Sequence, residues 1–208
     1  MKNIVMAITG ASGALYAQRL AQCIVESGAH LHLVISPLGR RLLFDELGIR
    51  RVTIETLLGR PASNATLYSY QDVGARIASG SFLTDGMVIC PCSSNTLGAV
   101  AAGTGGSLIT RAASVTLKEA RRLVIVHREM PCSPIELENM LRLSRAGAII
   151  CPANPGYYLL PQTVGDLVDF VVGKVLDLLA IPHGLHTRWS PGAAAGAPEF
   201  SDDAGEAE

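Results

Sequence analysis

Short, almost unbroken apolar segments recur along this chain. Five of them are rich in Val and Ile, and they cover residues 4–8, 31–35, 87–90, 123–126 and 148–151. Strands that are buried on both faces of a parallel sheet have this pattern, because neither face meets water. The pattern therefore predicts a parallel sheet that contains these five strands.

Segments with apolar residues at helical spacing lie between the predicted strands and after the last one. We expect helices over residues 13–26, 38–46, 95–102, 108–120, 134–144 and 164–179. Strands that alternate with helices predict a single α/β domain, Rossmann-like or flavodoxin-like, with helices on both faces of the sheet. Residues 49–76 show no clear period and receive no assignment.

The composition changes this picture in one respect. The chain has 208 residues, of which 49% are hydrophobic and only 17% are charged. Soluble domains usually carry about a quarter charged residues. The scarcity of charge excludes an intrinsically disordered chain, and it predicts that part of the apolar surface is covered in a homo-oligomer.

The net charge of −1 is the sum of two unlike parts. Residues 190–208 contain five acids and no Lys or Arg, and they are rich in Ala, Gly and Pro, so we expect a disordered acidic tail there. Residues 1–189 form the predicted domain and carry 17 bases against 13 acids, a charge of +4. This charge is too small for a nucleic-acid footprint, but it suits small anionic molecules.

The cysteines and histidines show no metal-ligand spacing, and we predict no metal site. Five cysteines that lie mostly in or beside apolar runs favour a reduced, cytoplasmic setting. No uninterrupted apolar run approaches the roughly 20 residues that a membrane helix needs, so we expect no membrane association. The apolar N-terminal segment leads directly into Gly10 and is interpreted as a first strand rather than a signal peptide.

The residues that follow each predicted strand are the candidates for a site, because ligands of such sheets bind outside the carboxyl ends of the strands. Small hydroxyl residues follow the first three strands, whereas charged or aromatic residues follow the last two. The first group is Thr9 and Ser12, Ser36, and Ser93, Ser94 and Thr96; the second is Arg128 and Glu129, then Tyr157 and Tyr158. This segregation predicts a site with a phosphate-binding half and a reactive half.

Each motif of the phosphate-binding half also has a purely structural interpretation. The turn from Gly10 to Gly13 suits the approach of a phosphate to a helix N-terminus, but a tight turn capped by Ser12 needs the same residues. Ser36 stands where a dinucleotide-binding fold places an acid, which favours a mononucleotide over NAD. The four residues from Ser93 to Thr96 are consistent with either helix capping or a phosphate or flavin contact.

The reactive half has equally plain alternatives. Arg111 and Lys118 belong to the densest basic stretch, which is either a solvated helix face or an anion site. An acid beside cations at the sheet edge indicates proton transfer next to an anionic leaving group, although Arg128 and Glu129 also suit a structural ion pair. The faces of the two tyrosines suit a cationic fragment or a planar ring, and core packing explains Tyr157 equally well.

Several short motifs occur together in one order, and in this order the chain resembles the UbiX-type flavin prenyltransferases over roughly residues 2–189. The motifs are Thr9-Gly10-Ala11-Ser12-Gly13-Ala14, Ser79-Gly80-Ser81-Phe82, Cys90-Pro91-Cys92-Ser93, Thr110-Arg111-Ala112-Ala113, Leu117-Lys118-Glu119, Arg128-Glu129 and Pro161-Gln162.

The resemblance implies a reaction in which reduced FMN and dimethylallyl phosphate give prenylated FMN and phosphate. The dimethylallyl group becomes attached to N5 and C6 of the flavin, and the product serves a UbiD-type decarboxylase. The resemblance also implies a homo-oligomer, a dodecamer with its sites at subunit junctions, and a reaction that needs no metal.

The resemblance further implies which residues form the site. FMN would be held by Gly10, Ala11, Ser12, Ser36, Ser93, Ser94, Asn95, Thr96 and Arg111. The prenyl phosphate would be surrounded by Lys118, Arg128, Glu129, Tyr158 and Lys174, of which Lys118, Glu129 and Tyr158 are also catalytic. Ser12 and Glu46 would assist proton movement near the flavin. Leu159 and Gly48 depart from the family's pattern, which favours a His and an acid at these positions.

Two alternatives remain beside the prenyltransferase. One is an FMN-dependent cysteine-type decarboxylase, whose relatives use a catalytic His in the region of residues 45–75, where this chain has none. The other is a non-catalytic FMN-binding or carrier subunit of a decarboxylase system. FMN binding alone would not require Lys118, Arg128, Glu129 and Tyr158 together.

Overall fold

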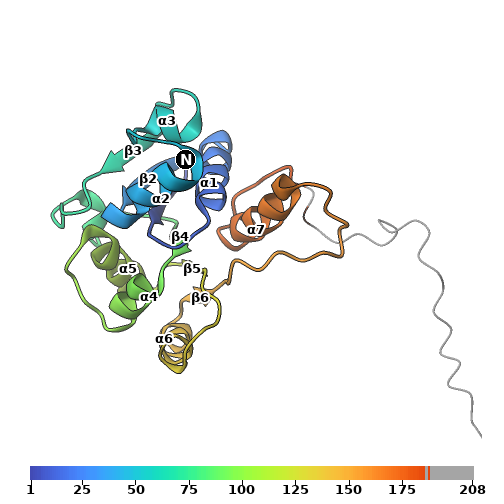
Figure 1. The fold of residues 1–208 in the computed structure, drawn as a ribbon. Helices are drawn as coiled ribbons and strands as arrows, with labels where there is room; N and C mark the ends of the chain where they lie inside the picture. The colour runs from blue at the N-terminus through green and yellow to red at the C-terminus, as the bar shows by residue number, and fades with distance from the viewer. Residues whose placement is uncertain (186, 188–208) are drawn as a thin grey trace, which may run out of the picture.

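The computed structural model describes residues 1–185 and 187, and its centre is one sheet of six parallel strands (Figure 1). The strands lie in the order β3-β2-β1-β4-β5-β6, which is the doubly wound Rossmann arrangement. They are β1 (Asn3–Ile8), β2 (His30–Ile35), β3 (Ala65–Tyr68), β4 (Gly86–Cys92), β5 (Leu123–His127) and β6 (Ile149–Ile150).

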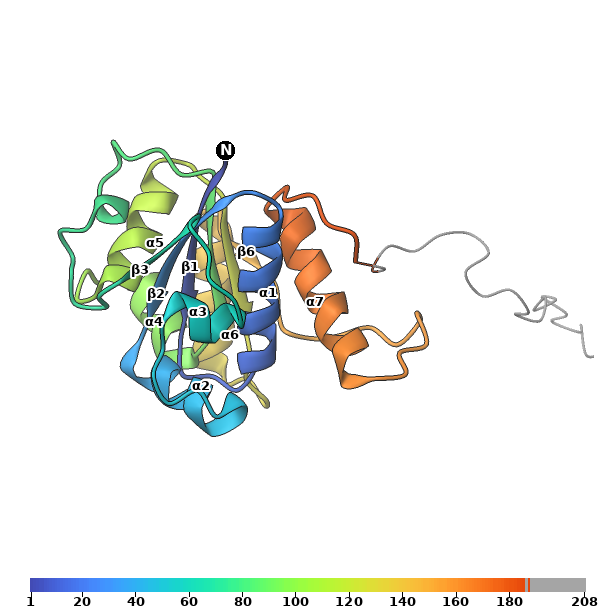
Figure 2. The same ribbon diagram turned by 90° about the horizontal axis from the view of Figure 1, so that it is seen from above.

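Helices cover both faces of this sheet. α1 and α7 pack together on one face, and α4 and α5 lie on the other (Figure 2). The helices are α1 (Ala14–Glu26), α2 (Pro37–Leu47), α3 (Ile54–Leu58), α4 (Ser94–Ala101), α5 (Leu108–Lys118), α6 (Pro134–Arg145) and α7 (Val164–Leu178), with a short 3₁₀ turn at Arg76–Ala78. The predicted α/β class is confirmed.

The central strand β1 shows why the apolar runs are continuous. Ile4 and Met6 enter the core beneath α1 and α7, whereas Val5 and Ala7 enter the core beneath α4 and α5. All four side chains are at most 1% exposed. Because successive residues of a strand point to opposite faces, a strand covered on both sides has no polar position.

All five predicted strands and all six predicted helices are present, but residues 49–76 contain two elements that the periodicity did not indicate. These are the helix α3 and the edge strand β3, which pairs with β2. All four residues of β3 are only partly buried, and α3 has five residues. Elements this short leave no measurable period in the sequence.

The boundary between the predicted domain and its tail lies outside the described residues, since these end at residue 187. The tail prediction for residues 190–208 therefore stays a prediction. Among the described residues, no helix has both the length and the apolar character that a bilayer crossing requires.

A buried histidine in β2 gives the stability of this fold a pH dependence. The ring of His32 hydrogen-bonds Tyr68 Oη at 2.9 Å and Asn3 Oδ1 at 3.2 Å. Burial, His30 and Arg76 together lower the pKa of His32 from 6.5 to about 4. Between pH 6.5 and 4, His32 is therefore protonated in the unfolded chain but stays neutral in the native state. The native state loses stability as the pH falls through this window.

We expect the protonation of His32 to lower the free energy of unfolding of the wild type by about 1 kcal/mol for each unit by which the pH falls. The largest slope that one titrating group can give is about 1.4 kcal/mol per pH unit. The His32→Gln variant, which has no ionisable ring, is expected to show a flatter dependence. Denaturant titrations at pH 7, 6 and 5 and at one protein concentration measure the difference. Parallel curves for the two proteins would contradict the assignment.

Candidate active site

The order of the strands reverses between β1 and β4, and a buried threonine joins the loops that follow them. Thr9 Oγ1 donates to the carbonyl oxygen of Pro91 at 2.8 Å and accepts from the backbone N–H of Ser93 at 2.9 Å. Ligands of open α/β sheets bind in the crevice at such a reversal. Thr9 was a candidate because it directly follows a predicted strand, although the resemblance gave it no contact with a ligand.

The carboxylate of Glu46 occupies the N-terminus of α1. Its Oε2 accepts from the backbone N–H groups of Gly13 at 3.1 Å and Ala14 at 2.7 Å. Gly13 has φ 131°, a conformation that favours glycine. The turn from Gly10 to Gly13 was expected to offer its N–H groups to a phosphate, but the chain's own carboxylate takes the N–H of Gly13, together with that of Ala14 at the start of α1.

The environment of Glu46 favours its ionised form. Burial acts to raise the pKa of this carboxyl, but hydrogen bonds from Ser12 and from the N–H groups of Ala14 and Gly13, together with the charge of Arg128, outweigh it, and the pKa is lowered. The predicted pair of Ser12 and Glu46 is therefore in contact. An ionised carboxylate at this position accepts protons and donates none.

The N-terminus of α4 keeps its donors available. Ser93 is the N-cap, and its side chain accepts from the N–H of Thr96 at 3.4 Å. In the described part of the chain, no acceptor bonds the N–H of Ser94 or Asn95. Two open N–H groups at the positive end of a helix fit a phosphate, so this end and not that of α1 suits the phosphate of FMN.

Strand β5 brings the reactive half to the same edge. Arg128 Nε donates to the carbonyl oxygen of Ser12 at 3.2 Å, and Ser94 Oγ donates to Glu129 Oε2 at 3.3 Å. Within the described residues, Arg128 and Glu129 form no ion pair with each other. The structural ion pair that the sequence left open is therefore absent, and both groups remain available to a ligand.

Two predicted flavin contacts have structural partners of their own. Ser36 is the N-cap of α2, and its buried Oγ accepts from the N–H of Gly39 at 2.9 Å. Arg111, on the second turn of α5, donates to the carbonyl oxygen of Ala78 at 3.3 Å. Gly10 lies exposed and Ala11 buried in the turn after β1. The flavin contacts of these residues stay predictions.

Lys118 does not lie beside Arg128 and Glu129 in one chain. It is the last residue of α5, it pairs with Glu119, and β5 begins five residues later at Leu123. Lys118 therefore lies at the amino edge of the sheet, whereas Glu129 follows the carboxyl end of the same strand. A strand of this length spans about 17 Å. The expectation that both groups act on one phosphate requires a second copy of the chain.

Tyr158 and Lys174 belong to a third region, where the loop after β6 meets α7. The Tyr158 ring packs edge-on against Phe170 of α7, with the ring centroids 5.6 Å apart. Lys174 is exposed on α7 and near enough to Cys151 to influence its thiol electrostatically. Tyr157 is 68% exposed, which excludes the core-packing interpretation of this residue.

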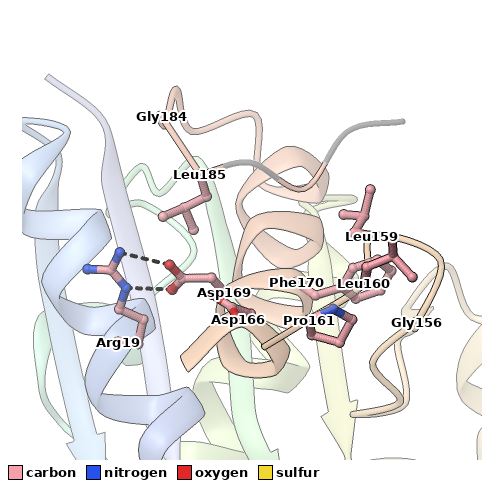
Figure 3. Close-up of a pocket in the computed structure, with 10 residues that line it drawn as sticks. All are labelled: Arg19, Gly156, Leu159, Leu160, Pro161, Asp166, Asp169, Phe170, Gly184 and Leu185. Carbon is pink, nitrogen blue, oxygen red and sulfur yellow. Dashed lines mark hydrogen bonds and ion pairs between the residues drawn. The ribbon is translucent and has the colours of Figure 1, made fainter. Parts of the chain in front are cut away.

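A cavity of about 480 Å³ lies beside this loop, between α1 and α7 (Figure 3). Its walls include Leu159, Leu160 and Phe170, and Arg19 and Asp169 form an ion pair of 2.7 Å on its α1 side. None of the predicted FMN contacts lines it. Leu159, the departure from the family's pattern, gives this cavity an apolar wall where a histidine would be polar.

The two cysteines of β4 lie directly behind the candidate site. Cys90 and Cys92 are both buried, and burial raises the pKa of each thiol. A protonated thiol is a poor nucleophile. These cysteines therefore serve as small apolar side chains under the site rather than as reactive groups.

Comparisons with known proteins point in one direction. A family model described as Flavoprotein matches residues 1–176. The chain is 50% identical over 186 residues to a flavin prenyltransferase UbiX of Halalkalibacterium halodurans, covering 88% of this chain and 90% of the relative. It is 44% identical over 196 residues to the flavin prenyltransferase UbiX of Pseudomonas aeruginosa, covering 90% of this chain and 94% of the relative.

Solved structures agree with these relatives. The crystal structure of AnUbiX in complex with FMN and dimethylallyl pyrophosphate matches with a TM-score of 0.84 and 37% identity, over 91% of this chain and 98% of that chain. A dodecameric FMN-dependent UbiX-like decarboxylase from Escherichia coli O157:H7 matches with a TM-score of 0.83 and 42% identity, over 92% and 100%. The FMN-dependent cysteine decarboxylase TvaF is 16% identical with a TM-score of 0.59, a likeness of fold alone.

Proposed function

This chain belongs to the flavoprotein family and, within it, to the UbiX-type flavin prenyltransferases, and from this membership we propose its reaction. It transfers the dimethylallyl group of dimethylallyl phosphate to N5 and C6 of reduced FMN, and the products are prenylated FMN and phosphate. FMN is a substrate in this reaction, and no metal takes part in it.

One observation of the structure carries the proposal more than any other. The Ser94 hydroxyl lies at the open N-terminus of α4 and donates to Glu129 Oε2 at 3.3 Å. This hydrogen bond joins the half of the site that suits a flavin phosphate to the half that holds an acid beside Arg128. A protein that only carried FMN would need the first half alone.

The residues around this bond divide the chemistry between them. Arg128 neutralises charge that develops on the departing phosphate, because a cation at a preorganised position stabilises an anionic leaving group. Glu129 exchanges a proton on the phosphate side. Ser12 and Glu46, which are in contact with each other, handle protons near the flavin ring. Tyr158 offers an aromatic face to the allyl fragment.

The position of Lys118 indicates a site shared between subunits. Within one chain it lies at the far edge of the sheet from Glu129, so Lys118 reaches the prenyl phosphate only from a neighbouring copy. Large apolar side chains near the candidate site are exposed in the single chain, among them Leu38, Met130, Ile135 and Leu160. We infer a homo-oligomer, a dodecamer like that of the E. coli relative, in which these side chains are covered.

The two alternatives have less support. The cysteine decarboxylase likeness is one of fold alone, whereas the prenyltransferase relatives cover about nine-tenths of the chain. A non-catalytic FMN carrier leaves the joined acid and cation of the reactive half unexplained.

The proposed reaction also indicates a partner and a setting. From the family membership we infer that the product supplies a UbiD-type decarboxylase. All five thiols are free, which favours a reducing, cytoplasmic setting.

A direct assay tests the proposed function. The purified protein is incubated without oxygen with reduced FMN and dimethylallyl phosphate, and the released flavin is analysed by mass spectrometry. We expect a flavin whose mass has increased by one pentenyl unit. A parallel reaction with dimethylallyl pyrophosphate identifies the preferred donor. An unmodified flavin with both donors would overturn the prenyltransferase proposal.

A further inference from the structure

His127 is a buried histidine at the candidate site to which the predicted mechanism gives no role. It is the last residue of β5, it directly precedes Arg128 and Glu129, and it is 2% exposed. Its Nε2 lies 3.3 Å from Ser94 Oγ, and Ser94 Oγ lies 3.3 Å from Glu129 Oε2. The three side chains therefore form one line of hydrogen bonds that ends at the acid of the reactive half.

The chemistry of the three groups fixes the direction of this line. A serine hydroxyl has one proton to donate, and an ionised carboxylate only accepts. When Glu129 is ionised, Ser94 donates to Glu129, and His127 donates its Nε2–H to Ser94. When Glu129 carries a proton on Oε1, its Oε2 still accepts from Ser94, so the direction of the line and the tautomer of His127 stay the same. A neutral imidazole with its proton on Nε2 therefore suits both protonation states of Glu129.

We propose that His127 is a positioning residue that, through Ser94, holds the Glu129 carboxyl in one orientation before and after its proton transfer. The inference rests on the proposed function, because it assumes that Glu129 exchanges a proton during prenyl transfer. His127 is 2% exposed and so offers almost no surface to either substrate. It acts on the reaction by keeping Ser94 bound on the side away from Glu129.

The surroundings of His127 suit a neutral ring. Burial lowers the pKa of His127 and Arg128 lowers it too, whereas the negative charges of Glu136 and Glu129 act in the opposite direction. Hydrogen bonds within the capping box of Ser133 are the larger cause that lowers the pKa of Glu136 on α6, and they hold this carboxylate, whereas the Ser94 hydroxyl also helps to lower this pKa. The Ser94 hydroxyl therefore has two neighbouring carboxylates and only one proton to donate. The hydrogen bond from His127 Nε2–H fixes the orientation of this hydroxyl.

Four variants test the proposal through the rate of prenylated FMN formation: His127→Val, His127→Gln, Ser94→Ala and the double variant Ser94→Ala/His127→Val. We expect His127→Val to lower kcat about 10-fold and to leave the KM for FMN within about 2-fold, because the flavin contacts stay in place. His127→Gln, whose amide can donate or accept, is expected to recover most of the loss.

The double variant separates positioning from a general structural defect. If His127 acts through Ser94, the double variant is expected to be no slower than Ser94→Ala alone, because the line is already broken. If the two substitutions acted independently, their effects on kcat would multiply, and the kcat of the double variant would be about 10-fold below that of Ser94→Ala. His30→Gln, at the opposite edge of the sheet, is the matched control and is expected to react at the wild-type rate.

Three outcomes are decisive. Wild-type turnover in His127→Val, or multiplied losses in the double variant, would overturn the inference and leave the proposed function standing. A wild-type protein that forms no prenylated flavin would overturn the proposed function itself, so the two failures are distinct. Should His127→Val fail to fold, His127→Leu, which also removes both ring nitrogens, takes its place in the single and the double variant with the same expected rates, and wild-type turnover in His127→Leu would overturn the inference.

Discussion

The Glu129→Gln variant is expected to bind FMN normally and to form prenylated FMN about 10²- to 10⁴-fold more slowly than the wild type. Glutamine has the shape of glutamate, and its amide can keep both contacts of the carboxylate: the amide oxygen accepts from the N–H of Met130, and the amide NH2 donates to Ser94 Oγ. The side chain therefore stays in place and loses only its ability to exchange a proton. The loss is expected in kcat, since the substitution leaves unchanged the N-terminus of α4, where we propose that the flavin phosphate binds.

Single-turnover rates with reduced FMN and dimethylallyl phosphate measure this effect, and a fluorescence titration of oxidised FMN measures flavin affinity. Glu138→Gln is the matched control, because Glu138 is an exposed carboxylate on α6, in the next helix along the chain. Turnover of Glu129→Gln at the wild-type rate would limit Glu129 to a structural role. A parallel loss of FMN affinity would move Glu129 to the flavin half of the site.

The sheet and its helices could be predicted because their signals are local. A strand such as β5 is fully buried and reads as a continuous apolar run, and its length and flanking residues are visible in a single window of sequence. β3 has no such signal, because it is four residues long and only partly buried at the edge of the sheet. The segment around it is organised by tertiary contacts, which periodicity does not report.

The candidate site could be predicted only as far as the ends of the strands. The hydroxyl residues and the acid were placed correctly at the carboxyl edge, because this edge follows from strand order alone. Sequence spacing could not show that Glu46 binds the N-terminus of α1, 32 residues away in the chain. The position of Lys118 at the amino edge of the sheet could not be predicted either. The resemblance names the residues of the site, but it does not say which subunit supplies each of them.

The role of His127 was missed for a related reason. It was counted among scattered histidines without metal spacing, and that test is blind to a hydrogen bond across 33 residues of sequence. Its position directly after the predicted strand over residues 123–126 was the same signal that identified Glu129. A titratable residue at the carboxyl end of any strand in such a sheet is therefore a candidate for the site, whatever its neighbours in the sequence.

The start of α2 is the place where a single methyl group is expected to do the most structural damage. A Cβ at Gly39 would lie 2.5 Å from the carbonyl oxygen of Ile8 and 3.2 Å from Ile35 Cγ2. Both neighbours end strands of the sheet, so the backbone oxygen cannot move aside without disturbing β1. Gly39→Ala is therefore expected to lower the free energy of unfolding by about 3 kcal/mol.

Gly98 provides the matched control for Gly39→Ala, because it lies in a helix where the nearest atom to an added Cβ is Asn139 Nδ2 at an ordinary 3.5 Å. Gly98→Ala is expected to stabilise the protein by about 0.5–1 kcal/mol. Thermal unfolding at one protein concentration measures both, with a fall of about 6–12 °C in Tm for Gly39→Ala. FMN affinity is expected to weaken in Gly39→Ala as well, since displacing α2 moves Glu46 from the N-terminus of α1. A Tm at or above that of the wild type would show that α2 can shift away from β1 without cost, and the placement of Glu46 would then not depend on this contact.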